Sequence, residues 1–265
     1  MKYGFIGLGN MATAILRGMK SSGEFAKDTI YGYDISDEKC AALADELGLS
    51  ICKSETETAE SVDTLVLAVK PQMMAGVLDK ISASLSNCKR IITIAAGKPL
   101  DFYKKHLGEI SVIRIMPNIN AKVCAAVSGL CGNESATEDD RAVAKKIFET
   151  VGKVFEINEE QFPAFSALGG ASGSFVLMMI DAIASAGVKA GLSRRLSEDI
   201  AKEVVIGSGK LAEQSAEHPC ALVDQICSPG GTTIEGVHML KKMGFEAAIH
   251  EGISAIIEKD YKLGK

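Results

Sequence analysis

The chain has 265 residues, 47% of them hydrophobic and 24% charged, which suits one large or two modest folded domains and excludes a disordered protein. Its 29 basic and 34 acidic residues give a net charge of −5, which argues against a broad electrostatic contact with nucleic acid. Only 5% of the residues are aromatic and Trp is absent, so a stacking platform for bases is not expected either. We therefore predict a cytoplasmic α/β protein that acts on a small molecule.

Short β-rich runs alternate with helical patterns in the first part of the chain. Two of the helical patterns open with a hydroxyl residue followed three positions later by an acid, Ser54 with Glu57 and Thr137 with Asp140, which is typical of a helix N-terminus. The alternation predicts βαβ units, that is, a doubly wound and mostly parallel sheet with helices on both faces. The expected strands are 3–6, 29–34, 64–69, 90–95, 111–116 and 154–157.

The last strand pattern is followed only by helical patterns, which are separated by glycines and prolines. We therefore predict two domains: residues 1–158 contain the sheet, and residues 159–265 are entirely helical. The longest apolar stretch, 175–192, is interrupted by Asp181 and Lys189, so we expect a buried helix and no membrane span. A helix that is apolar on nearly every side needs a partner around it, and a second subunit is the candidate.

The seven cysteines are odd in number, include no C-x-x-C pair and are irregularly spaced, so we expect small buried hydrophobic residues in a reducing compartment. A zinc site is the alternative for Cys220, Cys227 and His238, but their spacing matches no recognised zinc pattern, and no metal is expected. Met1 leads directly into a strand pattern, so we expect no targeting peptide.

The most informative motif is a glycine-rich turn near the N-terminus. Gly7, Gly9 and Ala12 form G-x-G-x-x-A after a strand pattern and at the start of a helical one. In a dinucleotide-binding turn the first glycine permits the tight turn, the second lets a pyrophosphate approach, and the third small residue keeps helix and strand close. Asn10 and Met11 lie in the first helical turn, whose free N–H groups attract phosphate. A plain turn is the alternative, but the flanking strand and helix favour a Rossmann-like dinucleotide site.

Asp34 ends the second strand pattern, 25 residues after Gly9. This is near the spacing of about 20 residues for a carboxylate that accepts from the adenine ribose hydroxyls. Such a carboxylate repels a 2′-phosphate, and Lys39 is the nearest cation after it. The expected cofactor is therefore NADH or NADPH, and Asp34 favours NADH. The alternative is that Asp34 only caps the helix that begins near Asp37.

Further cofactor contacts are expected where other strands end, because ligands of open parallel sheets gather at the carboxyl ends of the strands. Gly97 allows close approach of a ligand, Asn118 offers both a donor and an acceptor, and Lys70 can meet an anionic group. In the plain alternative the prolines only end strands or begin helices, and Lys70 is solvated. The candidates are Val69, Lys70, Pro71, Ala96, Gly97 and Asn118.

A second glycine-rich loop, Ser-Pro-Gly-Gly-Thr-Thr, lies in the helical part of the chain. Thr232 and Glu235 have the spacing of a capping box, which is the structural interpretation. A compatible functional interpretation is a carboxylate site made by free N–H groups at Gly231, Thr232 and Thr233, with a hydroxyl that hydrogen-bonds a substrate nitrogen. Two glycines and three hydroxyls exceed what a cap requires, so we expect a substrate site. Its residues are Ser228, Gly230, Gly231, Thr232 and Thr233.

These motifs make the chain resemble the pyrroline-5-carboxylate reductase family over essentially its whole length. The resemblance implies a Rossmann domain followed by a helical domain that interlocks with its twin in a homodimer, and larger rings of dimers occur in the family. It implies hydride transfer from NADH or NADPH to the C=N carbon of a cyclic imine, which gives L-proline in the last step of proline biosynthesis. It also implies that Thr233 lies beside the imine nitrogen as the catalytic donor. The shared motifs are 5–12, 69–71, 95–97, 115–118 and, most distinctively, 228–233.

Two segments depart from the family pattern. Residues 169–174 read Gly-Gly-Ala-Ser-Gly-Ser where Ser-Gly-Ser-Gly-Pro-Ala is usual, and residues 118–120 read Asn-Ile-Asn where Asn-Thr-Pro is usual. The first departure falls beside the nicotinamide and dimer contacts that the resemblance implies. Two alternatives therefore stay open. One is a paralogue that reduces another cyclic imine or a β-hydroxyacid with Lys189 or Lys210 as the acid, and the other is a non-enzymatic dinucleotide-sensing protein.

Overall fold

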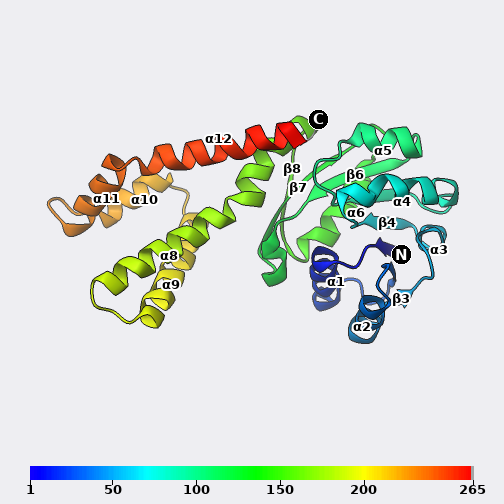
Figure 1. Ribbon diagram of the computed structural model, residues 1–265, viewed down its shortest axis with the longest axis horizontal. Helices are drawn as coiled ribbons and strands as arrows, with labels where there is room; N and C mark the ends of the chain where they lie inside the picture. Colours follow the sequence, from blue (N-terminus) through cyan, green and yellow to red (C-terminus); the bar gives the residue numbers. More distant parts are fainter. Residues whose placement is uncertain (264–265) are drawn as a thin grey trace. The chain divides into compact units, whose positions relative to one another are not determined.

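The computed structural model describes residues 1–263, which form two compact units (Figure 1). The first unit comprises Met1–Gly170 together with the chain from Ile257 onward, and the second comprises Ala171–Ile256. Residues 264 and 265, at the end of the predicted helical domain, lie outside the described residues. The first unit contains a sheet covered by helices, whereas the second is helical.

The sheet has eight strands in the order β3-β2-β1-β4-β5-β6-β7-β8. Neighbouring strands pair in parallel, except that β6 and β7 are antiparallel. Because β1 pairs with both β2 and β4, the strand order changes direction there, and ligands of open sheets bind at this switch point. The strands are β1 (Lys2–Ile6), β2 (Thr29–Tyr33), β3 (Ser50–Ile51), β4 (Thr64–Leu67), β5 (Arg90–Thr93), β6 (Ser111–Met116), β7 (Ala126–Gly132) and β8 (Gly152–Glu156).

Helices cover both faces of the sheet, because neighbouring strand residues point to opposite sides. Phe5 joins one apolar cluster with α1, α2 and α6, while Ile6 joins another with α3, α4 and α5. Strands β4 and β5 are entirely buried, as parallel strands covered on both faces should be. The predicted doubly wound fold is confirmed. The helices of this unit are α1 (Asn10–Ser22), α2 (Asp37–Leu47), α3 (Glu55–Glu60), α4 (Met74–Ile81), α5 (Leu100–Leu107), α6 (Glu138–Glu149) and α7 (Phe162–Phe165).

All six predicted strands are present, one of them (111–116) with the predicted ends and the others with shifted ends, but the sequence interpretation missed β3 and β7. Strand β3 has only two residues. Strand β7 contains Gly129, which weakens a strand pattern. A Cβ atom at Gly129 would lie 2.9 Å from side-chain atoms of both Ile157 and Phe165. Packing therefore demands a small residue at a position where local β-propensity would favour a branched one.

The two predicted helix starts are confirmed. The Ser54 hydroxyl accepts a hydrogen bond of 3.1 Å from the N–H of Glu57. Thr137 and Asp140 form a reciprocal capping box at the start of α6, in which each side chain accepts from the backbone N–H of the other residue. Each cap supplies hydrogen-bond partners for N–H groups that a helix leaves unpaired at its first turn.

The cysteines are only partly buried as expected. Burial raises the pKa of the Cys88 thiol to about 11 and that of the Cys131 thiol to about 12, so both are protonated at neutral pH. The expectation is wrong for Cys124 and Cys220, which are exposed, and Cys227 is half-buried. The buried cysteines are Cys40, Cys52, Cys88 and Cys131.

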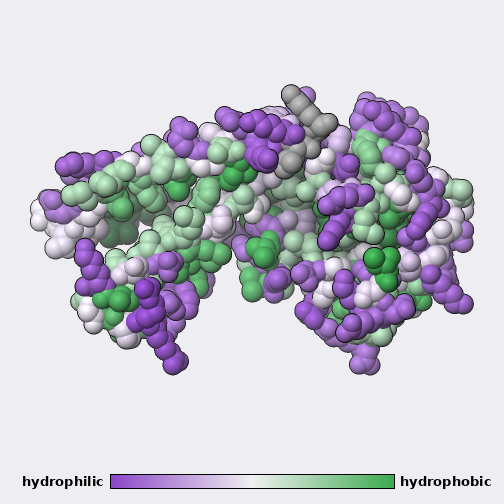
Figure 2. Space-filling view, viewed as in Figure 1, coloured by the Kyte–Doolittle hydropathy of each residue, from purple (hydrophilic) through white to green (hydrophobic). Residues whose placement is uncertain are grey.

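The second unit exposes its apolar side chains. In α8, Leu177 is 66% and Met178 is 70% exposed in the single chain, so the expected burial of this helix depends on the second subunit that was named as its candidate partner. An apolar groove of about 640 Å³ lies between α8, α11 and α12, and Figure 2 shows part of the apolar surface of this unit. Its helices are α8 (Gly173–Lys189), α9 (Arg194–Gln214), α10 (Pro219–Ile226), α11 (Thr232–Lys242) and the part of α12 (Phe245–Leu263) that precedes Ile257.

The helical run Glu159–Lys189 is long and apolar enough to cross a membrane by length and composition alone. Core helices of soluble proteins pass the same test, and a large exposed apolar patch also marks a protein–protein interface.

Candidate active site

The glycine-rich turn between β1 and α1 needs glycine at its first position. Gly7 has a φ angle of +92°, and a Cβ atom there would lie 2.8 Å from the backbone carbonyl of Ala68. The N–H of Gly7 donates to the carbonyl oxygen of Tyr33 at 2.8 Å. The turn is therefore held against the ends of β2 and β4, which flank β1.

The second glycine of the motif has a different basis. Gly9 is the N-cap of α1 with a φ angle of −74°, which any residue can adopt, and a Cβ atom there would meet no protein atom within 4 Å. Folding therefore does not require glycine at this position, but the approach of a ligand to the backbone would. Asn10 and Met11 follow at the open N-terminus of α1, while Ala12 is buried against the core.

Asp34 fixes the glycine-rich turn from the end of β2. Its Oδ2 accepts from the N–H of Leu8 at 2.7 Å, and its Oδ1 accepts from the N–H of Ser36 at 3.0 Å. Lys39 Nζ lies 4.0 Å from Oδ1. Ser36, and not Asp34, is the N-cap of α2, so the capping alternative is wrong. The carboxylate retains lone pairs for further donors, because each oxygen can accept more than one hydrogen bond.

A cavity of about 370 Å³ lies at these strand ends and brings together five of the predicted cofactor residues. Ile35 and Met73 also line it, although their side chains are large, apolar and exposed. Pro71 begins the short 3-10 helix η1 (Pro71–Met73) directly after Lys70. The five predicted residues in this cavity are Gly7, Gly9, Asp34, Val69 and Lys70.

Asn118 is placed differently from its neighbours in the prediction. It is buried at the end of β6, where its Nδ2 donates to the carbonyl oxygen of Gly169 at 2.7 Å. Its Oδ1 accepts from the N–H groups of Asn120 and Val127 at 3.3 and 3.2 Å. Gly169 lies in a π-helical turn, Ser166–Ala171. The amide of Asn118 is therefore engaged with protein backbone.

Ala96 and Gly97 follow β5, and Gly97 lines a second cavity, of about 910 Å³. Arg114, which the sequence interpretation did not single out, lines the same cavity from β6. Its Nη1 donates to Glu159 Oε1 at 3.0 Å, and its guanidinium lies 4.0 Å from the centroid of the Phe162 ring. The signal in the sequence was a charged residue between the apolar residues Ile113 and Ile115 of this strand.

The Ser-Pro-Gly-Gly-Thr-Thr loop lies in the second unit, at the start of α11. Gly231 is the N-cap and no side chain caps the helix, so the predicted capping box of Thr232 with Glu235 is wrong. The N–H of Gly231 donates to the carbonyl oxygen of Ser228 at 3.0 Å, so it is not free either. Thr232 and Thr233 occupy the first turn of α11, where backbone N–H groups have no partner inside the helix.

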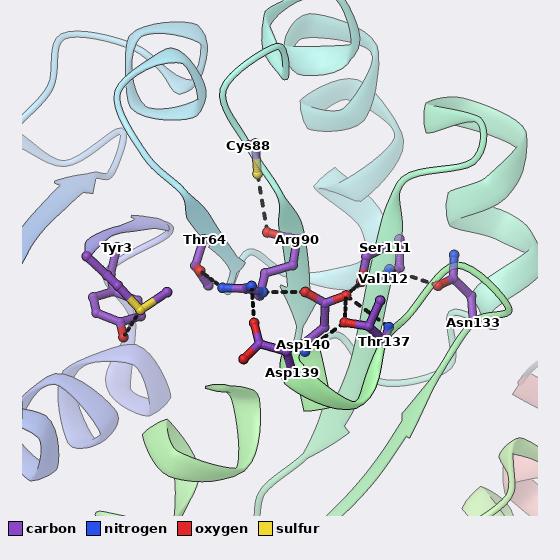
Figure 3. A network of polar contacts seen from close by, with 11 residues as sticks. Tyr3, Thr64, Cys88, Arg90, Ser111, Val112, Asn133, Thr137, Asp139 and Asp140 are labelled. Atoms are coloured by element: carbon purple, nitrogen blue, oxygen red, sulfur yellow. Dashed lines mark hydrogen bonds and ion pairs between the residues drawn. The ribbon is translucent and has the colours of Figure 1, made fainter. Parts of the chain in front are cut away.

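A buried polar network lies at the amino ends of the strands, opposite the carboxyl ends that form the cavity (Figure 3). Arg90, at the start of β5, donates to Asp140 Oδ1 at 2.5 Å, to Asp139 at 3.0 Å and to the Thr64 hydroxyl at 3.2 Å. Burial alone would raise the pKa of Asp140, but hydrogen bonds from Arg90, Thr137 and Ser111 outweigh burial and hold the pKa below its usual value. Within residues 1–263, no group of three or more His, Cys, Asp or Glu side chains is placed to hold a metal ion.

Two family models match the chain. Residues 159–263 match pyrroline-5-carboxylate reductase dimerisation, and residues 2–97 match NADP oxidoreductase, coenzyme F420-dependent. The chain is 40% identical over 265 residues to pyrroline-5-carboxylate reductase of Escherichia coli strain K12, which covers 100% of this chain and 98% of that protein. It is 34% identical to pyrroline-5-carboxylate reductase of Methanosarcina acetivorans, with 100% and 98% coverage.

Solved structures agree with these relatives. A pyrroline-5-carboxylate reductase from Coxiella burnetii superimposes with a TM-score of 0.93 at 26% identity, covering 99% of this chain and 98% of that chain. Pyrroline carboxylate reductase of Plasmodium falciparum, with NADP bound, superimposes with a TM-score of 0.85 at 29% identity, covering 100% and 98%.

Proposed function

Because this chain belongs to the pyrroline-5-carboxylate reductase family, we propose that its predicted site residues bind the cofactor and the substrate of the family's reaction. The chain is an NAD(P)H-dependent oxidoreductase that reduces 1-pyrroline-5-carboxylate to proline. Residues 1–158 hold the cofactor in this proposal, and residues 159–265 bind the substrate and form the subunit contact. The observation that supports the cofactor site is the cavity at the β1 switch point, which Gly7 and Gly9 line and where Gly9 leaves open space beside the backbone.

The residues at this cavity fit a dinucleotide. Gly9 leaves space beside the first turn of α1, where unpaired N–H groups of Asn10 and Met11 and the helix dipole attract a pyrophosphate. Lys70 lines the same cavity and adds a positive charge. When bound, the nicotinamide cofactor supplies the hydride for the C=N carbon. Val69, Pro71, Ala96, Gly97 and Asn118 complete the proposed cofactor set from the ends of β4, β5 and β6.

Asp34 supports a preference for NADH. Its carboxylate is mostly buried, with 11% of the side chain exposed, and lines the cofactor cavity. It can accept from ribose hydroxyls, whereas a 2′-phosphate would meet a like charge. Asp34→Asn retains an acceptor for the N–H of Leu8 and removes the charge, so it separates this role from support of the turn. We expect this variant to shift the Kd ratio of NADH and NADPH towards NADPH, and an unchanged ratio would exclude Asp34 as the discriminating group.

The loop at the start of α11 is the proposed substrate-binding site. In the proposal, the N–H groups of Thr232 and Thr233 bind the substrate carboxylate at the positive end of the helix dipole. Gly230, with a φ angle of +69°, permits the turn, and the N–H of Gly231 bonds to Ser228 and stabilises it. The Thr233 hydroxyl then hydrogen-bonds the imine nitrogen, which orients the C=N bond and balances charge during reduction.

The chain forms a homo-oligomer, and we propose a homodimer through the helices of the second unit. The exposed apolar residues of α8 and the groove beside α11 and α12 support this contact, because burial of such a surface against a second copy is favourable. Dimers can assemble further into a ring. The seven free cysteines fit a reducing compartment, which supports the cytoplasm as the location.

The test is reduction of synthetic 1-pyrroline-5-carboxylate by the purified protein, followed as loss of nicotinamide absorbance. We expect turnover with at least one of NADH and NADPH, and no oxidation of either would contradict the function. Thr233→Ala should reduce kcat/KM by about 100-fold, the range for one positioned donor, and leave the Kd for the cofactor within about twofold. Equal losses in turnover and in cofactor binding would assign Thr233 a structural role only.

A further inference from the structure

The dinucleotide cavity is lined by a second buried carboxylate besides Asp34. Glu55, the first residue of α3, is 7% exposed and contributes to the cavity wall together with Tyr33 and Asp34. We propose that Glu55 is a specificity-determining residue that excludes a phosphate from the adenosine end of the cofactor. The proposal rests on the NADH preference described above and extends it to a residue outside the glycine-rich motif.

The charge of Glu55 is maintained by Lys80. Lys80 Nζ donates to Glu55 Oε1 at 2.8 Å. Burial alone would raise the pKa of Glu55, but the hydrogen bonds from Lys80 and from its own backbone N–H outweigh burial and lower that pKa. The carboxylate is therefore ionised at neutral pH, and its second oxygen remains able to accept from a ligand.

The cations near the cavity do not cancel this charge inside it. Lys39 and Lys80 have side chains that are 55% and 60% exposed, whereas those of Asp34 and Glu55 are 11% and 9% exposed. Solvent screens an exposed charge more strongly than a buried one. Lys39 and Lys70 both line the cavity and both are exposed, and Lys70 is available for the pyrophosphate. The two carboxylates therefore dominate the potential where a ligand's buried end would lie.

That end is expected to be the adenosine. Ile35 and Met73 line the cavity with side chains that are 73% and 42% exposed, and a planar base would cover both. Ribose hydroxyls and an exocyclic amino group can donate hydrogen bonds, and the carboxylates of Asp34 and Glu55 can accept them. A 2′-phosphate instead brings about −1.5 to −2 charges and only acceptor oxygens. Two buried carboxylates therefore favour the unphosphorylated nucleotide.

The experiment measures Kd values by isothermal titration calorimetry on the full-length protein. The probes are AMP and adenosine 2′,5′-bisphosphate, which carry the discriminating group without the nicotinamide, and then NADH and NADPH. We expect Glu55→Gln to reduce the preference for AMP over the bisphosphate by about tenfold, equivalent to about 1.4 kcal/mol. The matched control is Glu57→Gln, which removes the same charge from an exposed side chain of α3 outside the cavity lining and should change the ratio by less than about twofold.

A second variant gives a change of opposite sign. Lys80→Gln removes the counter-charge, so the preference for AMP should increase when binding is measured well above the pKa of Glu55. Unchanged ratios in both Glu55→Gln and Lys80→Gln would overturn the proposal. Equal weakening of both probes by Glu55→Gln, with no change of ratio in Lys80→Gln, would also overturn it and assign Glu55 a structural role.

If the proposed preference for NADH is itself wrong, the binding measurements will give a different result. In that case the unmodified protein would bind the bisphosphate and NADPH more tightly than AMP and NADH. The ratios of Glu55→Gln and Lys80→Gln relative to that protein would still decide whether Glu55 contributes to the discrimination.

Discussion

The carboxyl ends and the amino ends of the parallel strands, called here the carboxyl edge and the amino edge of the sheet, use polar groups in opposite ways. At the carboxyl edge, Gly9 leaves backbone accessible, and a cavity of about 370 Å³ is open there. At the amino edge, the first residues of β4, β5 and β6 are Thr64, Arg90 and Ser111, which join Asp140 in a closed network (Figure 3). One edge keeps hydrogen-bonding groups for a ligand, and the other satisfies them within the protein.

This difference separates binding from stability. An unpaired donor at an open helix N-terminus is solvated until a ligand replaces the water, so it contributes to affinity. A buried ion pair is surrounded by protein, so removal of one partner leaves a charge without solvent. Substitutions at the amino edge should therefore change the free energy of unfolding, and those at the carboxyl edge should change the Kd of the cofactor.

The largest effect is expected for Arg90→Met at the amino edge. Arg90 is 4% exposed, and its loss leaves the Asp140 carboxylate buried without its cation. We expect the free energy of unfolding to fall by about 3–5 kcal/mol, measured by urea denaturation at a fixed protein concentration. The Kd for NADH should be unchanged under conditions in which the variant is folded.

The matched control for Arg90→Met is Arg17→Met. Arg17 also pairs with a carboxylate, Glu46, at 2.6 Å, but their side chains are 58% and 43% exposed. Its removal should lower the free energy of unfolding far less than the loss of Arg90 does, because solvent screens an exposed ion pair. Equal losses in the two variants would show that burial does not distinguish the Arg90 network from a surface ion pair.

A large effect on binding is expected for Gly9→Ala at the carboxyl edge. The backbone at Gly9 suits alanine and the added methyl group would meet no protein atom, so the midpoint of urea denaturation should not decrease. The same methyl group would obstruct the approach of the pyrophosphate, and we expect the Kd for NADH to rise by about 10- to 100-fold, or about 1.4–2.8 kcal/mol. Gly76→Ala is the control, since its Cβ also meets no protein atom and it does not line the cofactor cavity. An unaltered Kd in Gly9→Ala would contradict the proposed position of the pyrophosphate.

A smaller effect should appear as pH falls. The pKa of Asp140 is lower in the folded protein than its usual value of 3.8, so the folded state favours the ionised carboxylate. Its contribution is fully present above the pKa of the unfolded chain and is lost as pH falls through the folded pKa. Denaturation at a series of pH values should show that the difference in the free energy of unfolding between the unmodified protein and Arg90→Met becomes smaller below about pH 4. A constant difference in the free energy of unfolding across this range would mean that Asp140 is not responsible for the pH dependence.

The sequence indicated the glycine-rich turn at the carboxyl edge but not the ion pair at the amino edge. Gly7 acts through turn geometry and Asp34 through hydrogen bonds to neighbouring backbone, and such local requirements leave a fixed spacing in the sequence. Arg90 and Asp140 are 50 residues apart and meet only after β5 and α6 pack, so no local spacing announces the pair. The capping box at Thr232 failed for a related reason: Gly231 could take the N-cap position itself, and the spacing of Thr232 and Glu235 does not reveal that competition.

The smallest effect tests whether every buried polar group of the sheet is satisfied. Ser128, in β7, is fully buried, and its hydroxyl has no hydrogen-bond partner among the described residues, whereas the buried hydroxyls of Thr93 and Tyr103 bond to each other at 2.6 Å. An unpaired buried hydroxyl costs about 1–3 kcal/mol, so Ser128→Ala should leave the free energy of unfolding unchanged or raise it by about 1 kcal/mol. Tyr103→Phe should lower the free energy of unfolding by about 1 kcal/mol, because it removes the buried hydrogen bond between the Tyr103 and Thr93 hydroxyls. A loss of stability in Ser128→Ala as large as in Tyr103→Phe would show that Ser128 is hydrogen-bonded to buried water and that the sheet interior is as fully satisfied as its amino edge.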